Sequence, residues 1–435
     1  MKTFPGCRRL LLALTLGFLG AGRASAQDLH WANWRGPTGD GLAAADCTPP
    51  LTWSEDSNLR WKVELPGLGN STPIVVGDHI YLTTAIKLES KAGAQPGAPT
   101  AEGEHQYVVL ALDRASGEEV WRKVVHTAKP HDKGHRTGSH ASASISTDGT
   151  HLVAFFGSRG LFVLDMQGEV LWSKQLGEMT ILANFGEGST PALHDGTVVV
   201  QWDEEGPSFV AAYQVADGKE LWREPREVDS TWGSPVVAEV GGKPQVILTG
   251  SDTTMAYDLV SGEVIWTCGG MSKNPVNSPL VVDGVAWVMN SYKGVTIQAI
   301  VLADAEGSLD PEEDLLWSRN RDAAYVPPPL VVDGLLYYTR DSTGVLTCLD
   351  AGTGEVRYAA KRLGGIKRIH ACPIATPGRI YFTGREGSSL VIRAGAEFEI
   401  VATNVLDDVF DATPAFVGDE IYMRGRSHLY CIAED

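Results

Sequence analysis

Beyond its first 26 residues, the sequence has no apolar run long enough to cross a bilayer as a helix, and it has no two adjacent cysteines. It also lacks a Cys-x-x-Cys-His segment, which excludes a covalently attached c-type haem. A Gly-x-Ser-x-Gly elbow, a phosphate-binding glycine loop and a His-Glu-x-x-His pair are absent too, so the corresponding hydrolase and nucleotide-binding classes have no support. What the chain does have is 48 glycines and 12 tryptophans in 435 residues, and their spacing is informative.

Residues 1–26 are typical of a secretory signal peptide. Lys2, Arg8 and Arg9 precede an apolar run at 10–19, and small residues close the segment at 24–26. No cysteine follows at the cleavage position, so a lipoprotein is not predicted. Cleavage would leave 32 basic against 54 acidic residues and move the formal charge from −18 to −22, a surface that repels nucleic acid and anionic membranes. We expect an exported protein, periplasmic or otherwise extracytoplasmic, that is soluble after cleavage and has no membrane span.

A repeated unit runs through the rest of the chain. Within each copy, short runs rich in Val, Ile and Tyr are separated by turns with Gly or Asp, as in consecutive strands. Proline opens the later copies at intervals of 44, 44, 50, 44 and 41 residues, namely at Pro191, Pro235, Pro279, Pro329, Pro373 and Pro414. An earlier copy opens at Pro73, and the gap of 118 residues leaves room for one more unit in which Ser144 takes the place of proline. An aromatic residue closes the copies at Trp61, Trp121, Trp172, Trp222, Trp266, Trp317 and Tyr358.

A period in the forties with four strands per unit is typical of a β-propeller. We predict an all-β fold, an eight-bladed β-propeller of four-stranded antiparallel blades over 59–435, with a lead-in at 27–58 that packs on the ring. Residues 59–65 have the pattern of a fourth strand with no first three, whereas the last unit has three strands and no fourth. We therefore expect the N-terminal strand to complete the last blade and close the ring, which removes exposed strand edges.

The five cysteines that follow the signal segment form an odd set, and no disulfide pairing is predicted. Cys348 and Cys431 occupy equivalent third-strand positions, so we expect them to be small buried residues between blades.

One face of the predicted ring varies between units while the other repeats. The turns at 282–284 and 332–334 both read Val-Asp-Gly, which is turn chemistry that serves folding. The loop before each first strand and the turn between the second and third strands share the opposite face and differ from unit to unit, as expected where a ligand binds. The binding-face candidates are His140, Glu187, Trp232, Asn277, Tyr325, Arg340, His370, Arg385, Asp411 and Arg424. None is assigned a catalytic role.

The segment Val-Val-Asp-Gly-Leu-Leu-Tyr-Tyr at 331–338, followed by Cys-Leu-Asp-Ala-Gly-Thr-Gly-Glu at 348–355, resembles the quinoprotein-type repeat of the PQQ-like β-propeller superfamily. The lead-in Trp-Ala-Asn-Trp-Arg-Gly-Pro at 31–37 is similar to that of exported bacterial members. The resemblance covers nearly all of 30–435 and implies an eight-bladed ring whose terminal tryptophans dock between neighbouring blades. The family contains quinone-dependent alcohol and sugar dehydrogenases, and also non-enzymatic members such as the outer-membrane assembly lipoprotein BamB.

The dehydrogenase branch implies a quinone held flat, a Ca²⁺ ion with carboxylate and amide oxygen ligands, and an Asp base. In this sequence Glu187, Asn277 and Asp411 are the residues that could supply Ca²⁺ oxygens, and Trp232 is the aromatic that could form a stacking floor. The vicinal cysteine pair typical of that branch is missing, and the chain leaves little length for a substrate lid.

Four histidines, His126, His131, His135 and His140, lie in the connection between the first and second units. Such a group could bind Zn²⁺ or Cu²⁺, but its spacings of 5, 4 and 5 match no metal motif, so an exposed polar loop without a metal is the preferred interpretation.

We therefore expect a non-enzymatic binding or assembly scaffold of the bacterial cell envelope, either a monomer or a subunit of a larger complex. Its funnel face would bind an envelope protein or peptide, with no cofactor and no nucleic acid. The alternative is a PQQ/Ca²⁺-dependent oxidoreductase that acts on alcohols or sugars, and a weaker third idea is a metal- or glycan-binding enzyme.

Overall fold

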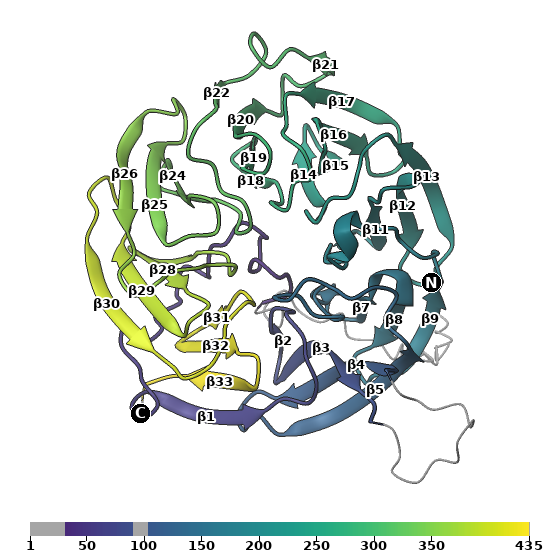
Figure 1. Ribbon diagram of the computed structural model, residues 1–435, viewed down its shortest axis with the longest axis vertical. Coiled ribbons are helices and arrows are strands. Elements are labelled where there is room, and N and C mark those ends of the chain that lie inside the picture. The colour runs from purple at the N-terminus through teal and green to yellow at the C-terminus, as the bar shows by residue number, and fades with distance from the viewer. Residues whose placement is uncertain (1–30, 90–102, 435) are drawn as a thin grey trace, which may run out of the picture.

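The computed structural model describes residues 31–89 and 103–434, so the signal segment at 1–26 and most of the insertion between Lys87 and Glu104 lie outside the described residues. Eight sheets surround a central axis, each with its first strand innermost (Figure 1). This confirms the predicted eight-bladed propeller of four-stranded antiparallel blades. None of the helices in the described ranges has the length and apolar character needed to span a bilayer.

The first four blades are built from consecutive strands. Blade 1 contains β2 (Ile74–Val76), β3 (His79–Lys87), β4 (His105–Asp113) and β5 (Glu119–Ala128). Blade 2 contains β6 (Ser146–Thr147), β7 (His151–Phe155), β8 (Leu161–Asp165) and β9 (Val170–Lys174), with the short 3₁₀ helix η2 (Gly157–Arg159) between β7 and β8. After η3 (Leu182–Asn184), blade 3 contains β10 (Ala192–His194), β11 (Thr197–Trp202), β12 (Ser208–Gln214) and β13 (Glu220–Arg226). Blade 4 contains β14 (Val236–Val240), β15 (Lys243–Gly250), β16 (Thr253–Asp258) and β17 (Val264–Gly269).

The remaining blades continue the ring. Blade 5 contains β18 (Leu280–Val282), β19 (Val285–Asn290), β20 (Thr296–Val301) and β22 (Trp317–Arg319). Blade 6 contains β23 (Leu330–Val332), β24 (Leu335–Thr339), β25 (Val345–Asp350) and β26 (Val356–Arg362). Blade 7 contains β27 (Ile374–Thr376), β28 (Arg379–Thr383), β29 (Ser388–Arg393) and β30 (Ile400–Val405). Blade 8 contains β31 (Ala415–Val417), β32 (Glu420–Arg424), β33 (His428–Ile432) and β1 (Leu59–Glu64).

Blade 8 takes strands from both ends of the described chain. β1 pairs antiparallel with β33, with Leu59 opposite Ile432 and Glu64 opposite His428. The two strands, purple and yellow, lie side by side in Figure 1. With β1 in place, blade 8 has four strands like the other blades, and the ring is closed.

The closing tryptophans hold neighbouring blades together at the perimeter. Trp222 at the end of blade 3 is buried, and its indole N–H donates to the Leu259 carbonyl of blade 4 at 2.9 Å. A Cβ on Gly262 would lie 2.7 Å from the Trp222 ring, so only glycine leaves room for this contact. The same arrangement recurs between Gly117 and Trp61, Gly168 and Trp121, Gly218 and Trp172, and Gly354 and Trp317.

The lead-in packs across the face that carries the repeated turns. Trp31 is fully buried and bridges to Val75 of blade 1, while the Thr48 N–H donates to the Gly418 carbonyl in the first turn of blade 8 at 2.9 Å. Trp53 stacks on Tyr381 of blade 7 with ring centroids 6.4 Å apart. Blade 7 has no tryptophan in its own fourth strand, so a residue more than 300 positions away supplies the aromatic contact that Trp121 makes with Tyr81 in blade 1.

Part of the acidic insertion in blade 5 forms a strand. β21 (Gly307–Leu309) pairs in parallel with β17 and adds a fifth strand to the outer edge of blade 4. The sequence predicts no strand in this segment, Asp304–Asp314, because three residues give no periodic signal.

Cys348 and Cys431 are buried, as predicted. All five cysteines in the described part of the chain are buried and free of disulfides. Burial raises the pKa of the Cys348 thiol to about 11, which keeps it protonated and unreactive near neutral pH.

Candidate functional site

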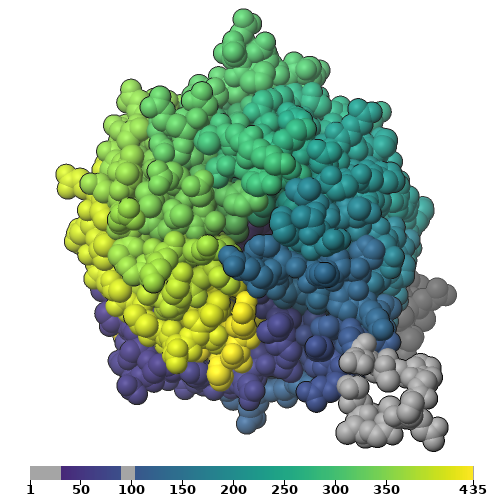
Figure 2. Space-filling model, viewed as in Figure 1, coloured from purple at the N-terminus to yellow at the C-terminus, as the bar shows by residue number. Residues whose placement is uncertain are grey.

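A cavity of about 470 Å³ lies at the mouth of the ring, lined by the loops that precede the first strands. Figure 2 shows this hollow at the centre of the face, with purple atoms of the N-terminal segment visible at its bottom. Trp34 lines the cavity from that segment. It is held there by its neighbour Arg35, which is buried, lies 5.8 Å from the Trp34 ring centroid and donates to the Pro329 carbonyl at 2.7 Å. The lead-in therefore forms the bottom of the cavity.

Hydroxyl groups form much of the cavity wall. Each of them belongs to the residue two positions before the first strand of a blade and accepts the backbone N–H of the same position in the preceding blade. The bonds run from Thr72 N to Ser144 Oγ at 2.9 Å, from Ser144 N to Thr190 Oγ1 at 3.0 Å, from Thr190 N to Ser234 Oγ at 2.9 Å, and from Ser234 N to Ser278 Oγ at 2.8 Å. The placement of Ser144 at the proline position was wrong by one residue, because Ser144 matches Thr190, which precedes Pro191, and Ile145 stands where the proline would be.

The segment that connects blades 1 and 2 lies over part of the mouth and is fastened on both sides. The His135 N–H donates to the Phe185 carbonyl at 2.8 Å, and the rings of these two residues meet edge to face at 5.2 Å. On the other side the Asn70 side chain donates to the Thr137 carbonyl at 3.1 Å. His135, Arg136 and Phe185 thereby reach the cavity from its open side.

Asp411 is held by Arg385 and His370 at the wall of the cavity. The Arg385 guanidinium binds both of its oxygens, with Nη2 3.0 Å from Oδ2, and His370 Nδ1 lies 2.8 Å from Oδ1. Burial acts to raise the pKa of Asp411, but the hydrogen bonds from His370 and Arg385 outweigh it and hold that pKa below its ordinary value. Asp411 is therefore a charged carboxylate whose ligand positions are occupied by its own neighbours.

Two arginines that line the same cavity have no such partner. In the described ranges the guanidinium groups of Arg136 and Arg368 make no ion pair or hydrogen bond, and both residues are exposed at the mouth. The pKa of His135 is lowered, first by burial and then by positive charge around it, from Arg136, His370, Arg385 and Arg368. One side of the cavity thus concentrates positive charge in a chain whose formal charge is −18.

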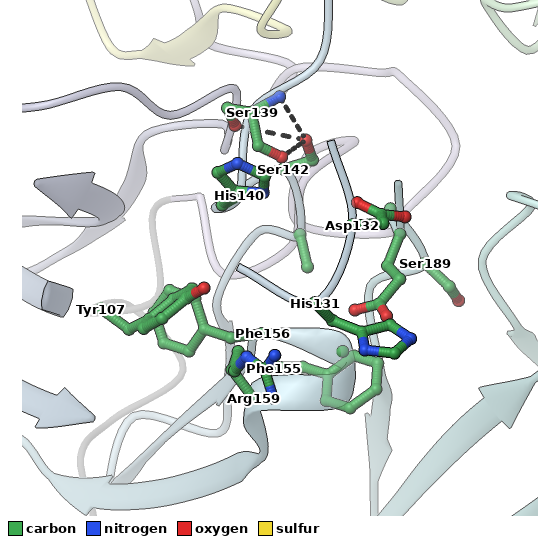
Figure 3. Close-up of a pocket in the computed structure, with 14 residues that line it drawn as sticks. Tyr107, His131, Asp132, Ser139, His140, Ser142, Phe155, Phe156, Arg159 and Ser189 are labelled. Atoms are coloured by element: carbon green, nitrogen blue, oxygen red, sulfur yellow. Dashed lines mark hydrogen bonds between the residues drawn. The ribbon is translucent and has the colours of Figure 1, made fainter. Parts of the chain in front are cut away.

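A small chamber of about 30 Å³ adjoins the cavity beneath the same segment. Figure 3 shows His131 and Asp132 on one side of it, Tyr107 on the other, and Ser139, Ser142 and His140 above. Three polar atoms that line it, Asp132 Oδ2, Arg159 Nε and Ser189 Oγ, are buried without a protein partner. The chamber has room for about one water molecule, which is the ordinary way to satisfy such atoms.

Glu187 separates the chamber from the cavity and lines both. Its carboxylate accepts hydrogen bonds from the Ser158 hydroxyl and from Ser158 N, the latter at 2.7 Å. Burial raises the pKa of Glu187 to about 6, and the nearby charge of Asp132 adds to the effect, while the Ser158 bonds oppose it. Glu187 therefore changes charge close to neutral pH.

The structure divides the ten binding-face candidates into three groups. Five of them line the cavity, namely Glu187, Trp232, Tyr325, His370 and Asp411, and His140 lines the small chamber. Arg385 lies behind Asp411, and Arg340 is half exposed on the rim, 3.9 Å from Asp322. Asn277 and Arg424 are buried in the wall between blades and do not line the cavity, so their assignment to the binding face was wrong. Asn277 Nδ2 donates to the Pro327 carbonyl and Arg424 Nη1 to the Thr83 carbonyl, while Asn277 Oδ1 and Arg424 Nε have no partner among the described residues.

The sequence analysis missed Trp34, Arg136, Arg368 and the ring of hydroxyls. The hydroxyls did carry a signal, because Ser or Thr precedes the opening proline in Thr72, Thr190, Ser234, Ser278 and Thr413. The two arginines lie in loops before first strands, which the repeat places on the binding face, but no feature of the sequence distinguishes them from the other polar residues of those loops.

The four histidines of the blade 1–2 connection do not converge. His126 lies on β5 with its ring 6.1 Å from that of Tyr107, His131 Nε2 faces the Met179 carbonyl at 2.7 Å, and His135 lines the cavity. The group that does come together in the described residues is His194, Asp195 and Glu239, exposed on the turn face across blades 3 and 4.

The Ca²⁺ ligand set considered for a quinoprotein does not fit the structure. Asn277 is buried outside the cavity, while both oxygens of Asp411 are taken by Arg385 and His370 and the Glu187 carboxylate is taken by Ser158. These three residues therefore do not present converging oxygens to one ion. Trp232 does line the cavity, but its indole N–H donates to the Gly186 carbonyl at 2.7 Å.

Comparisons with solved structures show the same fold at low identity. BamB from Moraxella catarrhalis is 12% identical, with a TM-score of 0.57 over 86% of this chain and 99% of that chain. A europium-containing methanol dehydrogenase is 12% identical, with a TM-score of 0.61 over 92% and 90% of the two chains. The quinohemoprotein alcohol dehydrogenase from Comamonas testosteroni is 11% identical, with a TM-score of 0.58 over 89% and 78%. No curated protein matches the sequence.

The family comparison is more specific than the fold. The family described as outer membrane protein assembly factor BamB matches residues 35–200, 104–360 and 206–433, which together span the lead-in and all eight blades. The chain belongs to this BamB-type family of PQQ-like β-propellers.

Proposed function

We propose that this protein is an exported, non-enzymatic binding scaffold of the bacterial cell envelope, which uses the cavity at the centre of its ring to bind a peptide segment of a protein partner. In this proposal it works as a monomer or as a subunit of a larger complex, without a cofactor.

The main support for the proposal is that the acidic groups of the cavity already have hydrogen-bond partners within the protein. Asp411 is bonded to the side chains of Arg385 and His370, and Glu187 to the hydroxyl and backbone N–H of Ser158. The guanidinium groups of Arg136 and Arg368 at the mouth have no partner in the described residues. An enzyme that used a metal here would need open carboxylates. A binding site for a partner needs uncommitted polar groups together with apolar surface, and Trp232, Phe185 and Tyr325 provide the apolar part.

Calorimetric titration of the mature protein with PQQ, with and without Ca²⁺, tests the proposal against its rival. We expect no saturable heat at micromolar concentrations in either condition. Tight binding that depends on Ca²⁺ would contradict the scaffold function and direct attention to dye-linked oxidation of alcohols and sugars.

The rival is a PQQ/Ca²⁺-dependent oxidoreductase, and one observation favours it. The cavity combines an aromatic wall at Trp232 with arginines that could hold carboxylates of a planar cofactor. In that case the ion would need ligands other than the set of Glu187, Asn277 and Asp411.

A further inference from the structure

We propose that the cavity captures the free carboxylate at the C-terminal end of an extended peptide. This inference rests on the proposed function and names the part of the partner that enters the ring.

The shape of the cavity favours a chain end over a chain that passes through. Trp34 closes the channel from the turn face, and its segment is pinned to the blades through Trp31 and Arg35. The open side is narrowed by the segment around His135, which is bonded to Phe185 (Figure 2). At about 470 Å³ the cavity is the size of a site for a small ligand, so a few residues of an extended peptide fill it and no folded domain can enter.

The positive charge at the mouth of the cavity favours a ligand with a carboxylate. Arg136 and Arg368 lie in loops that are far apart in the sequence, but they line the same cavity and make no ion pair within the described residues. Asp411, a carboxylate of the same cavity wall, is already bonded to Arg385 and His370. A guanidinium binds a carboxylate through two parallel hydrogen bonds, and a terminal carboxylate offers this geometry whatever the last residue is.

The hydroxyl groups of the wall add hydrogen-bond donors to the same cavity. Ser144, Thr190, Ser234 and Ser278 are all more than nine-tenths buried and line the cavity. Each oxygen accepts a backbone N–H, and no acceptor for the hydroxyl hydrogen occurs among residues 31–89 and 103–434. Each O–H is thus left to donate to a ligand, and oxygen atoms of a peptide end accept such bonds.

Aromatic side chains complete the site. Trp232, Tyr325 and Phe185 line the cavity from three different blade connections. They provide apolar surface for the side chain of the last residue, while the carboxylate meets the arginines and hydroxyls. Specificity for the residue type would then come from the aromatic wall and affinity from the charged end.

The test uses fluorescent pentapeptides that end in each of the common residues, synthesised as free acids and as matched carboxamides, and titrated by anisotropy into the full mature protein. We expect binding only among free acids, with the carboxamide twin at least about tenfold weaker because it loses charge-assisted hydrogen bonds. Arg136→Ala and Arg368→Ala should each weaken the free acid at least about tenfold. Arg340→Ala is the control, because Arg340 is an exposed arginine of the same rim that does not line the cavity. The affinity of this variant for the free-acid peptide should equal that of the wild type.

The outcomes separate the inference from the proposed function. If acid and carboxamide twins bind equally well and both lose affinity in the Trp232→Ala variant, the peptide scaffold stands and terminal capture is wrong. If no pentapeptide of either form binds, terminal capture is also wrong. Ca²⁺-dependent binding of PQQ in the same cavity would overturn both.

Discussion

The perimeter and the channel of this propeller are built by the same blades under different constraints. At the perimeter one contact recurs, in which the closing tryptophan of a blade rests on a turn glycine of the next, as Trp222 does on Gly262. In the channel only the hydroxyl before the first strand recurs, except in blades 6 and 7, where Pro328 and Cys372 occupy its position. The other groups that line the cavity differ from blade to blade, from Glu187 to Arg368. Contacts that only hold the ring together can be copied, whereas contacts that meet a ligand must differ.

The largest effect at the perimeter is expected from a closing tryptophan. Trp222→Ala should lower the free energy of unfolding by about 4 kcal/mol, because it removes a buried indole and leaves a cavity between blades 3 and 4. Chemical denaturation followed by circular dichroism measures the change. The neighbouring Leu221→Ala, on the exposed side of the same strand, is the control and should change little. Equal effects for the two variants would show that perimeter docking does not hold the blades together.

A turn glycine of the perimeter should give the next largest effect. Gly262 has a φ of +80° and its Cβ would meet the Trp222 ring at 2.7 Å, so Gly262→Ala combines backbone strain with a collision and should cost about 3 kcal/mol. Gly284 has a φ of +76° and no atom within 4 Å of its Cβ position, so Gly284→Ala carries only the backbone strain of about 1 kcal/mol. The difference between the two isolates the tryptophan contact. If both variants lose the same stability, the glycine is needed only for its conformation.

In the channel, the charged form of Glu187 should lower the stability of the fold, so replacing this residue should stabilise the protein at neutral pH. The pKa of Glu187 is raised to about 6 in the folded state, so the folded protein binds more protons than the unfolded chain between its ordinary pKa and about 6. The free energy of unfolding then falls by up to about 2 kcal/mol as pH rises through this window. Glu187→Gln stays neutral and should remove this loss, so the variant is more stable relative to wild type at pH 7.5 than at pH 4.5.

Denaturation midpoints at several pH values measure the Glu187 effect. Glu306→Gln, exposed on the blade 5 insertion, controls for the loss of a negative charge and should leave the pH profile as in wild type. A Glu187→Gln profile parallel to that of wild type would mean that the carboxyl group has an ordinary pKa.

The smallest effect on stability is expected at the mouth of the cavity. Arg368→Ala should change the free energy of unfolding by less than about 0.5 kcal/mol, because its guanidinium has no partner within the described residues. Arg226 is the contrast, since it is buried in the wall between blades 3 and 4 and its Nε lies 2.8 Å from Asp203 Oδ1. Arg226→Ala should cost about 3–5 kcal/mol by leaving a buried carboxylate unpaired. Denaturation of the two variants side by side gives the comparison, and a large loss for Arg368→Ala would place it in the framework instead of the binding site.

The predicted and observed features divide along the same line as the two regions. Strand runs, turn glycines and closing tryptophans recur at short range, and from them the eight four-stranded blades could be predicted. Trp53 packs on blade 7, but the sequence could not assign it to that blade, because its partner Tyr381 lies 328 positions further along the chain. Asn277 and Arg424 looked like face residues from their positions in the unit, but their burial depends on how neighbouring blades close around them.

The sequence by itself determined the number, order and strand content of the blades, because each blade is specified by its own alternation of apolar runs and turns. Only the tertiary structure decided which polar groups bond to one another within the protein and which are free to bind a ligand. Asp411 is paired while Arg368 is not, and Trp34 closes the channel, because loops from opposite ends of the chain are brought to one axis. Hydrogen bonds and charges act over a few ångströms in space, and the repeat in the sequence carries no record of those distances.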